Sequence, residues 1–153
     1  MTGNRSFSLR GTAFALGLLA AGAAQAATAI EVLKTASCGC CHAWVEYMAG
    51  NGFDVSARDL PMATLMSRKA EAGLRPGQTS CHTAFVEGYV IEGHVPAREV
   101  RRLLEQRPEA IGLSVPDMPY GSPGMGEPGP DADPYDVLLV RRDGTTEIFA
   151  RYP

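Results

Sequence analysis

The chain has 153 residues and a formal net charge of -3 at pH 7, with 17 acidic residues against 14 basic ones. A mildly acidic chain without a dense basic patch argues against nucleic acid or an anionic membrane surface as its partner. This length is within the usual size of one domain and is sufficient to bury a single hydrophobic core.

The N-terminal segment has the features of a secretory signal peptide. Arg5 and Arg10 lie on a short polar lead, an apolar run covers residues 13–24, and Ala24-Gln25-Ala26 offers a small-residue cleavage site. The apolar run is well short of the ~20 residues that a transmembrane helix needs. We therefore expect residues 1–26 to be cleaved and residues 27–153 to form one periplasmic domain without membrane contact. An uncleaved N-terminal anchor is the alternative.

Apolar periodicity predicts alternating strands and helices through the first half of this domain. Residues 30–35 are β-compatible, and residues 41–48 have the i, i+3, i+4, i+7 spacing of an amphipathic helix. Residues 53–58 alternate in the manner of a half-buried strand. A second helix is expected between Pro61 and Gly73. At helical spacing with other apolar residues, and therefore expected in the core, are Trp44, Met48, Met62 and Met66.

The second half predicts two hairpins separated by a helix and a long irregular segment. Residues 83–87 and 89–92 are β-rich runs joined at Gly88, and a third helix begins at Pro96 and ends before Pro108. The several prolines and glycines of residues 115–134 exclude regular structure. A final hairpin covers residues 136–151 and turns at Asp143-Gly144.

The predicted order β-α-β-α-β-β-α is that of a thioredoxin-like α/β fold, with a mixed sheet, flanking helices and an added C-terminal β-hairpin. The cysteines at the first β-to-α turn strengthen this assignment. In that fold the loop before the third strand faces this turn, and here that loop carries Cys81. We therefore expect Cys81 to join Cys38, Cys40 and Cys41 in one site, although it is distant from them in sequence.

Three cysteines in four residues, Cys38, Cys40 and Cys41, favour metal binding over a disulfide framework. A bridge between such close neighbours closes a very small loop and removes little entropy from the unfolded chain. A turn at a helix N-terminus can direct several sulfurs to one point, and its free amide hydrogens stabilise thiolates. Two disulfides among the four cysteines are the alternative.

Soft thiolate ligands favour Cu(I), zinc and iron-sulfur clusters over calcium or magnesium. A closed tetrahedral zinc site ordinarily uses two separated ligand pairs, whereas Cys40 and Cys41 are adjacent and suit a low-coordinate or multinuclear site. The spacings usual for iron-sulfur clusters are absent. We therefore predict that Cys38, Cys40, Cys41 and Cys81 bind Cu(I), with zinc as the less suitable metal.

Five further residues are candidates for secondary ligands or for a lid: His42, His82, His94, Met118 and Met125. Two of the histidines directly follow a cysteine, and the third precedes a predicted helix start. The methionines lie in the Pro-Gly loop, and thioethers are soft ligands that disulfide formation does not remove. We predict that this loop folds over the cysteines, because a loop of such length is usually functional. Histidines that merely satisfy their own turns, and methionines that fill gaps, are the alternatives.

With these motifs the chain resembles the bacterial family catalogued as domain of unknown function 411, periplasmic metal-binding proteins associated with copper resistance. The resemblance rests on residues 38–42, 80–83, 88–96 and 118–125. It implies a thioredoxin-like fold, copper bound by the cysteine cluster, and a role in changing the oxidation state of copper.

The predicted function is that of a periplasmic copper-binding protein of copper homeostasis or resistance, which holds Cu(I) and can change its redox state. A thiol-disulfide oxidoreductase of thioredoxin-like type is the alternative, since the fold and a low-pKa turn both permit it. The displacement of the usual C-x-x-C to C-x-C-C argues against that activity. The metal ion is the expected partner, and other periplasmic copper-handling proteins are candidates. The sequence pattern does not distinguish a copper store from a copper chaperone, and it does not distinguish a binding protein from an enzyme.

Overall fold

The computed structural model describes residues 26–153, in which a seven-stranded mixed sheet carries three helices. Apart from Ala26, the predicted signal peptide lies outside the described residues. Within residues 26–153, none of the helices combines the length and apolar character that a membrane crossing requires.

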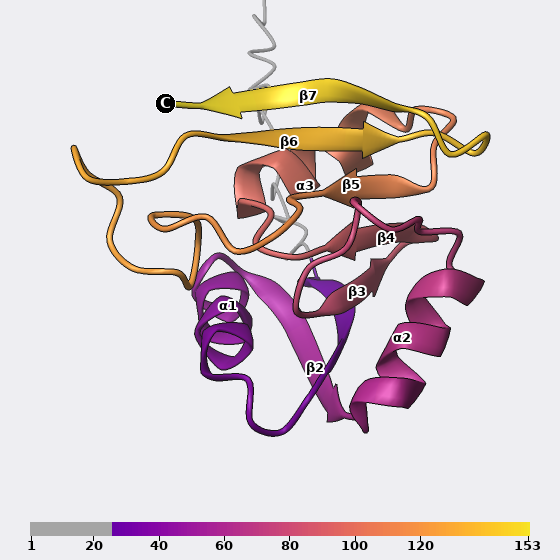
Figure 1. Cartoon of the computed structure of the whole chain (residues 1–153), viewed down its shortest axis with the longest axis horizontal. Coiled ribbons are helices and arrows are strands. Elements are labelled where there is room, and N and C mark those ends of the chain that lie inside the picture. Colours follow the sequence, from indigo (N-terminus) through magenta and orange to yellow (C-terminus); the bar gives the residue numbers. More distant parts are fainter. Residues whose placement is uncertain (1–25) are drawn as a thin grey trace, which may run out of the picture.

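The mixed α/β architecture agrees with the prediction, and the first seven elements follow the predicted order. In chain order the elements are β1 (Thr28–Lys34), α1 (Gly39–Gly50), β2 (Phe53–Asp59), α2 (Met62–Glu71), β3 (Thr83–Val86), β4 (Tyr89–Glu92), α3 (Ala97–Gln106), β5 (Gly112–Ser114), β6 (Tyr135–Val140) and β7 (Thr146–Tyr152). The sheet order is β2-β1-β3-β4-β5-β6-β7, as Figure 1 shows. The pairs β1/β2 and β4/β5 are parallel, and the other neighbouring strands are antiparallel.

Strand β5 joins the C-terminal hairpin to the rest of the sheet, and the sequence pattern does not predict it. The strand has only three residues, which is too short for alternation to be recognised. It pairs with β4 at Val90↔Gly112, where a Cβ on Gly112 would lie 1.7 Å from the Val90 carbonyl oxygen. The absence of a side chain at Gly112 therefore permits the pairing that makes one continuous sheet.

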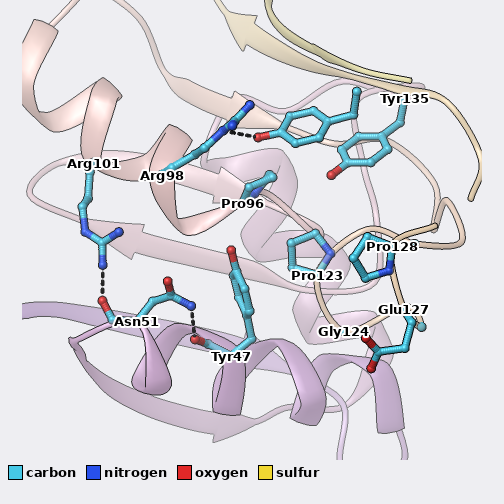
Figure 2. Close-up of a pocket in the computed structure, with 13 residues that line it drawn as sticks. Tyr47, Asn51, Pro96, Arg98, Arg101, Pro123, Gly124, Glu127, Pro128 and Tyr135 are labelled. Atoms are coloured by element: carbon cyan, nitrogen blue, oxygen red, sulfur yellow. Dashed lines mark hydrogen bonds between the residues drawn. The ribbon is translucent and has the colours of Figure 1, made fainter.

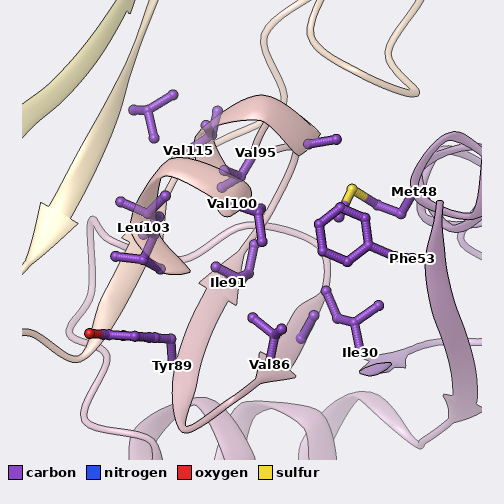
Figure 3. Packing of buried hydrophobic residues seen from close by; sticks show 14 of the residues in the cluster. Ile30, Met48, Phe53, Val86, Tyr89, Ile91, Val95, Val100, Leu103 and Val115 are labelled. Atoms are coloured by element: carbon purple, nitrogen blue, oxygen red, sulfur yellow. The ribbon is translucent and has the colours of Figure 1, made fainter. Parts of the chain in front are cut away.

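The two faces of the sheet are covered by different helices. The larger hydrophobic cluster combines Trp44 and Met48 of α1 and Val100 and Leu103 of α3 with one face of the sheet. Figure 3 shows Met48 and Phe53 side by side in this cluster, close to Ile30. On β4 the side chains alternate, so that Ile91 belongs to this cluster and Val90 to a smaller one on the other face.

The prediction that helical methionines lie in the core is confirmed for Met48 and is wrong for Met62 and Met66. These two side chains are 58% and 48% exposed. Helix α2 buries only a narrow stripe through Leu65 and Lys69, and the methionines lie on the neighbouring stripe that faces solvent. The helical spacing of apolar residues therefore does not show which side of α2 packs against the sheet.

The register between β1 and β3 brings the cysteines together. Leu33 pairs with Thr83 in an antiparallel ladder, so the chain that follows Leu33 and the chain that precedes Thr83 lie at the same end of the sheet. The first of these segments leads into α1 through Cys38, and the second contains Cys81. This arrangement is the physical basis of the predicted meeting of Cys81 with the first β-to-α turn.

We predict that Gly112→Ala lowers the free energy of unfolding by about 1–3 kcal/mol or more, because the added methyl must separate β4 from β5. Gly50→Ala is the matched control, since a Cβ there meets nothing within 4 Å and alanine favours the helix by about 0.5–1 kcal/mol. Urea unfolding of both variants measures the effect. Equal midpoints for Gly112→Ala and the unsubstituted protein would contradict the close approach.

Candidate metal centre

Four cysteines form one compact group at the end of the sheet. The Sγ atom of Cys40 lies 3.5 Å from that of Cys38 and 3.8 Å from that of Cys81. All four sulfurs, those of Cys38, Cys40, Cys41 and Cys81, lie within 4.8 Å of one another. The predicted proximity of Cys81 to the other three is thus confirmed, and their role as metal ligands stays a prediction.

A disulfide joins Cys38 to Cys41, while Cys40 and Cys81 are free thiols. The bonded pair is a C-x-x-C pair that the C-x-C-C motif contains, so the expectation that this usual spacing is displaced is wrong. The expectation that such close neighbours avoid a disulfide is also wrong for this pair. The first helical turn places the two Cα atoms 5.3 Å apart, which is within the normal span of a disulfide.

The N-terminus of α1 positions two of these sulfurs. Cys38 is the N-cap residue, and its Sγ accepts a hydrogen bond from the backbone N–H of Cys41 at 3.3 Å. The partial positive charge of a helix N-terminus stabilises an anion at this place. Once the disulfide is reduced, the same amide groups therefore favour the thiolate form that binds soft metals.

Cys81 also belongs to a second group of candidate ligands, together with His82 and His94. Its Sγ atom lies 3.0 Å from Nε2 of His94 and 3.4 Å from Nδ1 of His82. The other nitrogen of His94, Nδ1, lies 2.8 Å from the carbonyl oxygen of Pro123. Because a carbonyl only accepts, Nδ1 carries the proton and Nε2 presents its lone pair to Cys81.

Burial keeps this second group uncharged. It lowers the pKa of His82 well below its ordinary value, with the neighbouring His94 and Lys69 acting in the same direction. Burial also lowers the pKa of His94. Burial, with a contribution from Cys40, raises the pKa of Cys81 to about 12. Both imidazoles are therefore in the neutral form that binds metals, and Cys81 would have to release a proton to act as a ligand.

The ring of His82 is held between Trp44 and His94. Its centroid lies 4.5 Å from that of Trp44 and 5.1 Å from that of His94, the latter in an edge-on arrangement. Trp44 is itself fixed by a hydrogen bond from its indole N–H to the carbonyl oxygen of Val95. Among the described residues, Nε2 of His82 is buried without a hydrogen-bond partner. The nitrogen of His82 that faces Cys81 is the other one, Nδ1, so Nδ1 is the atom that could bind a metal ion there.

The other candidate residues lie apart from these two groups. His42 is exposed, and its Nε2 atom lies 3.1 Å from Nζ of the buried Lys34, which also pairs with Asp59. Met118 is 50% exposed, whereas Met125 is partly buried. The participation of these three residues in metal binding stays a prediction.

Residues 119–126, here called the covering loop, lie directly against the cysteine turn. A Cβ on Gly124 would lie 2.8 Å from the backbone nitrogen of Trp44 and 2.9 Å from the carbonyl oxygen of Cys40. Gly124 also has φ +85°, a conformation that favours glycine. With Pro123 bound to His94, the loop covers the site through its Pro-Gly backbone. The sequence pattern predicts no role for Pro123 and Gly124 individually, although the Pro-Gly pair is the signal that marks them.

A cavity of about 550 Å³ adjoins the covering loop, as Figure 2 shows. Its lining combines Tyr47 and Tyr135 with Arg98, and it shares Pro123 and Gly124 with the loop. None of the predicted metal ligands lines this cavity. The cavity is therefore separate from the cysteine site.

Fold and site together define a mixed α/β domain with a cysteine cluster that could hold a metal ion at one end of its sheet. Two solved structures, named "Copper resistance protein copG- Form 1" and "Copper resistance protein copG- Form 2", are each 38% identical to the chain. Each covers 83% of this chain and 98% or 99% of its own length, with TM-scores of 0.76 and 0.75. The family described as "Protein of unknown function, DUF411" matches residues 78–125. The chain belongs to this copper resistance family.

The matched region of the family includes Cys81, His82, His94 and the covering loop, but not the cysteine turn at the start of α1. The two solved structures extend the similarity over most of the described chain. A search among curated proteins found no match.

We predict that denatured, unreduced protein contains two reactive thiols and that full reduction raises the number to four, because only Cys38 and Cys41 are joined. Thiol titration with an Ellman-type reagent gives both numbers. Cys41→Ser provides the control, since it should expose three thiols without reduction. Four thiols before reduction, or none, would contradict the pairing.

Proposed function

We propose that the chain is a copper-binding protein of copper homeostasis or resistance that holds Cu(I) at Cys38, Cys40, Cys41 and Cys81. The observation that carries this proposal is the proximity of four sulfurs within 4.8 Å. The names of the two similar solved structures support copper as the metal. Sulfur ligands, supplemented by neutral imidazoles, match the preference of Cu(I) over hard cations.

The two ligand groups share Cys81, which supports a site for more than one copper ion. One group offers four sulfurs, and the other offers one sulfur and two imidazole nitrogens. A thiolate has several lone pairs, so the Cys81 sulfur can bind one metal ion in each group at the same time. His82 and His94 are accordingly the secondary ligands that we assign first, ahead of His42, Met118 and Met125.

The disulfide supports a role in changing the oxidation state of copper. The reduced Cys38/Cys41 dithiol and the disulfide differ by two electrons and two protons. Two Cu(II) ions can each accept one electron from this pair, so that two S–H bonds break, two protons pass to solvent, one S–S bond forms and two Cu(I) ions result. Cys40 and Cys81 remain free in the disulfide form and can retain the Cu(I) produced.

One observation favours a second candidate function, that of a thiol-disulfide oxidoreductase. The disulfide lies in a C-x-x-C spacing at the N-terminus of α1, where helix amides stabilise the thiolate of Cys38. The element order from β1 to α3 supports the proposed thioredoxin-like class. Copper remains the preferred substrate, because Cys40 and Cys81 lie close enough to the pair to bind metal with it.

We also propose that the domain works in the periplasm after removal of residues 1–26. The support is the signal-peptide pattern of the sequence and the similarity to copper resistance proteins. Other copper-handling proteins of that compartment are the candidate partners for delivery.

We predict that the fully reduced protein binds Cu(I) far more tightly than Zn(II), since its adjacent sulfurs suit low coordination. Competition against a Cu(I) chelator, with and without excess zinc, measures this preference. Cys81→Ser should lose about as much bound copper as Cys38→Ser, whereas His42→Ala should lose little. Retention of zinc in preference to copper would reverse the metal assignment.

We further predict that adding Cu(II) to the reduced protein without oxygen yields one Cys38–Cys41 disulfide for every two Cu(I) ions formed. Peptide mapping identifies the disulfide, and a Cu(I)-specific chromophore counts the ions. The Cys41→Ser variant lacks this dithiol and serves as the control. Formation of Cu(I) without the disulfide would exclude this electron source.

A further inference from the structure

A buried ion pair lies beside the candidate metal centre without belonging to either ligand group. Lys69 of α2 and Glu92 at the end of β4 have side chains that are only 2% and 0% exposed. Nζ of Lys69 lies 2.5 Å from Oε1 of Glu92. Burying two charges has a desolvation cost that their attraction seldom exceeds by much, so stability alone explains such a pair poorly.

The hydrogen bonds of Glu92 are directed to the loop that carries Cys81. Its Oε1 atom accepts the backbone N–H of Ser80 at 2.6 Å, and Ser80 directly precedes Cys81. Its Oε2 atom accepts the hydroxyl of Thr83 at 2.6 Å. One carboxylate therefore holds the chain on both sides of Cys81-His82.

Lys69 of helix α2 supplies the positive charge that pairs with Glu92. Its ammonium donates to Oγ1 of Thr83 at 2.8 Å as well as to Glu92. Thr83 and Glu92 are direct cross-strand partners of the β3/β4 hairpin. The ammonium thus neutralises the carboxylate where water cannot, and the carboxylate can accept from Ser80 as a charged and therefore stronger acceptor.

The next residue, Gly93, limits the position of the same loop. Its N–H donates to the carbonyl oxygen of His82 at 3.0 Å. A Cβ on Gly93 would lie 2.5 Å from Cβ of Ser80, so the two segments are in close contact. Residues 92–93 consequently hold both Ser80 and His82, the two neighbours of Cys81.

We propose that Glu92, with Lys69 as its counter-ion, is a positioning residue that fixes Cys81 opposite Cys40. The 3.8 Å separation of the Cys40 and Cys81 sulfurs depends on the place of the loop before β3, and Glu92 accepts the only hydrogen bond that the Ser80 N–H makes among the described residues. Only the consequence for copper affinity rests on the proposed function. The placement of Cys81 can be measured without metal.

The metal-free test uses a Cys38→Ser, Cys41→Ser background, in which Cys40 and Cys81 are the remaining cysteines. Equilibration with reduced and oxidised glutathione gives the effective concentration of one thiol toward the other. Lys69→Leu with Glu92→Leu replaces the ion pair by apolar residues and removes the acceptor for Ser80. We expect the effective concentration to fall by about tenfold or more, because the loop then samples other positions.

A conservative pair of substitutions separates this role from general stability. Lys69→Leu with Glu92→Gln also removes both charges, but its amide oxygen can still accept the Ser80 N–H, so the effective concentration should stay within about threefold of the unsubstituted value. Glu99→Leu removes another buried carboxylate, which lies on α3 and binds Arg98 and Arg102 of the same helix and Tyr152 of β7. This variant should lose stability without changing the Cys40/Cys81 equilibrium.

If the variant with Lys69→Leu and Glu92→Leu folds and its Cys40/Cys81 equilibrium is unchanged, the proposal is overturned. If that variant does not fold, Ser80→Pro removes the same hydrogen bond from the donor side. We expect Ser80→Pro to lower the effective concentration by the same tenfold, and an unchanged equilibrium in this variant would also overturn the proposal. Copper binding is then measured in the four-cysteine protein. A lowered effective concentration with unchanged Cu(I) affinity supports the positioning role and removes Cys81 from the proposed ligands.

Discussion

The antiparallel pairing of β1 with β3 is the constraint on which the site depends. Its register, Leu33↔Thr83, fixes the end of one strand beside the beginning of the other. Three parts of the site lie at this end of the sheet. Helix α1 begins there after Cys38, Cys81 lies just before β3, and the covering loop packs against the cysteine turn. A one-residue slip would turn the side chains of β3 to the opposite face and would separate Thr83 from Lys69.

The cysteine turn has two chemical states that share one backbone geometry. A helix N-terminus that brings residues 38 and 41 within disulfide distance also directs their thiolates to the same side when the bond is broken. Under the proposed function, metal binding and disulfide formation compete for the same sulfurs. Cys40, 3.5 Å from Cys38, and Cys81 are free in the disulfide form, so the oxidation state of the Cys38/Cys41 pair would set the number of sulfurs available to the proposed metal.

The sequence was sufficient for the features that have a strong local period or a clear topological consequence. The strand and helix alternation, the hairpin at Gly88 and the approach of Cys81 to the cysteine turn all follow from such patterns. Features that depend on tertiary contacts were missed. The three-residue β5 has no period, the exposure of Met62 depends on which stripe α2 buries, and the roles of Glu92 and Pro123 depend on partners distant in the chain.

The burial of the candidate ligands bears on the proposed binding of a metal ion at this site. The imidazoles of His82 and His94 are buried and neutral, and desolvation keeps the half-buried thiol of Cys81 neutral as well, so the side chains avoid the cost of unpaired internal charge. A cation bound as proposed would replace the thiol proton of Cys81, and the thiolate would neutralise part of the added charge. A hard ion would give up a strongly bound hydration shell and find few oxygen ligands in return. A soft monovalent ion would give up a weaker hydration shell and gain sulfur ligands. Low polarity at this end of the sheet, together with the sulfur ligands, thus supports the proposed preference for Cu(I).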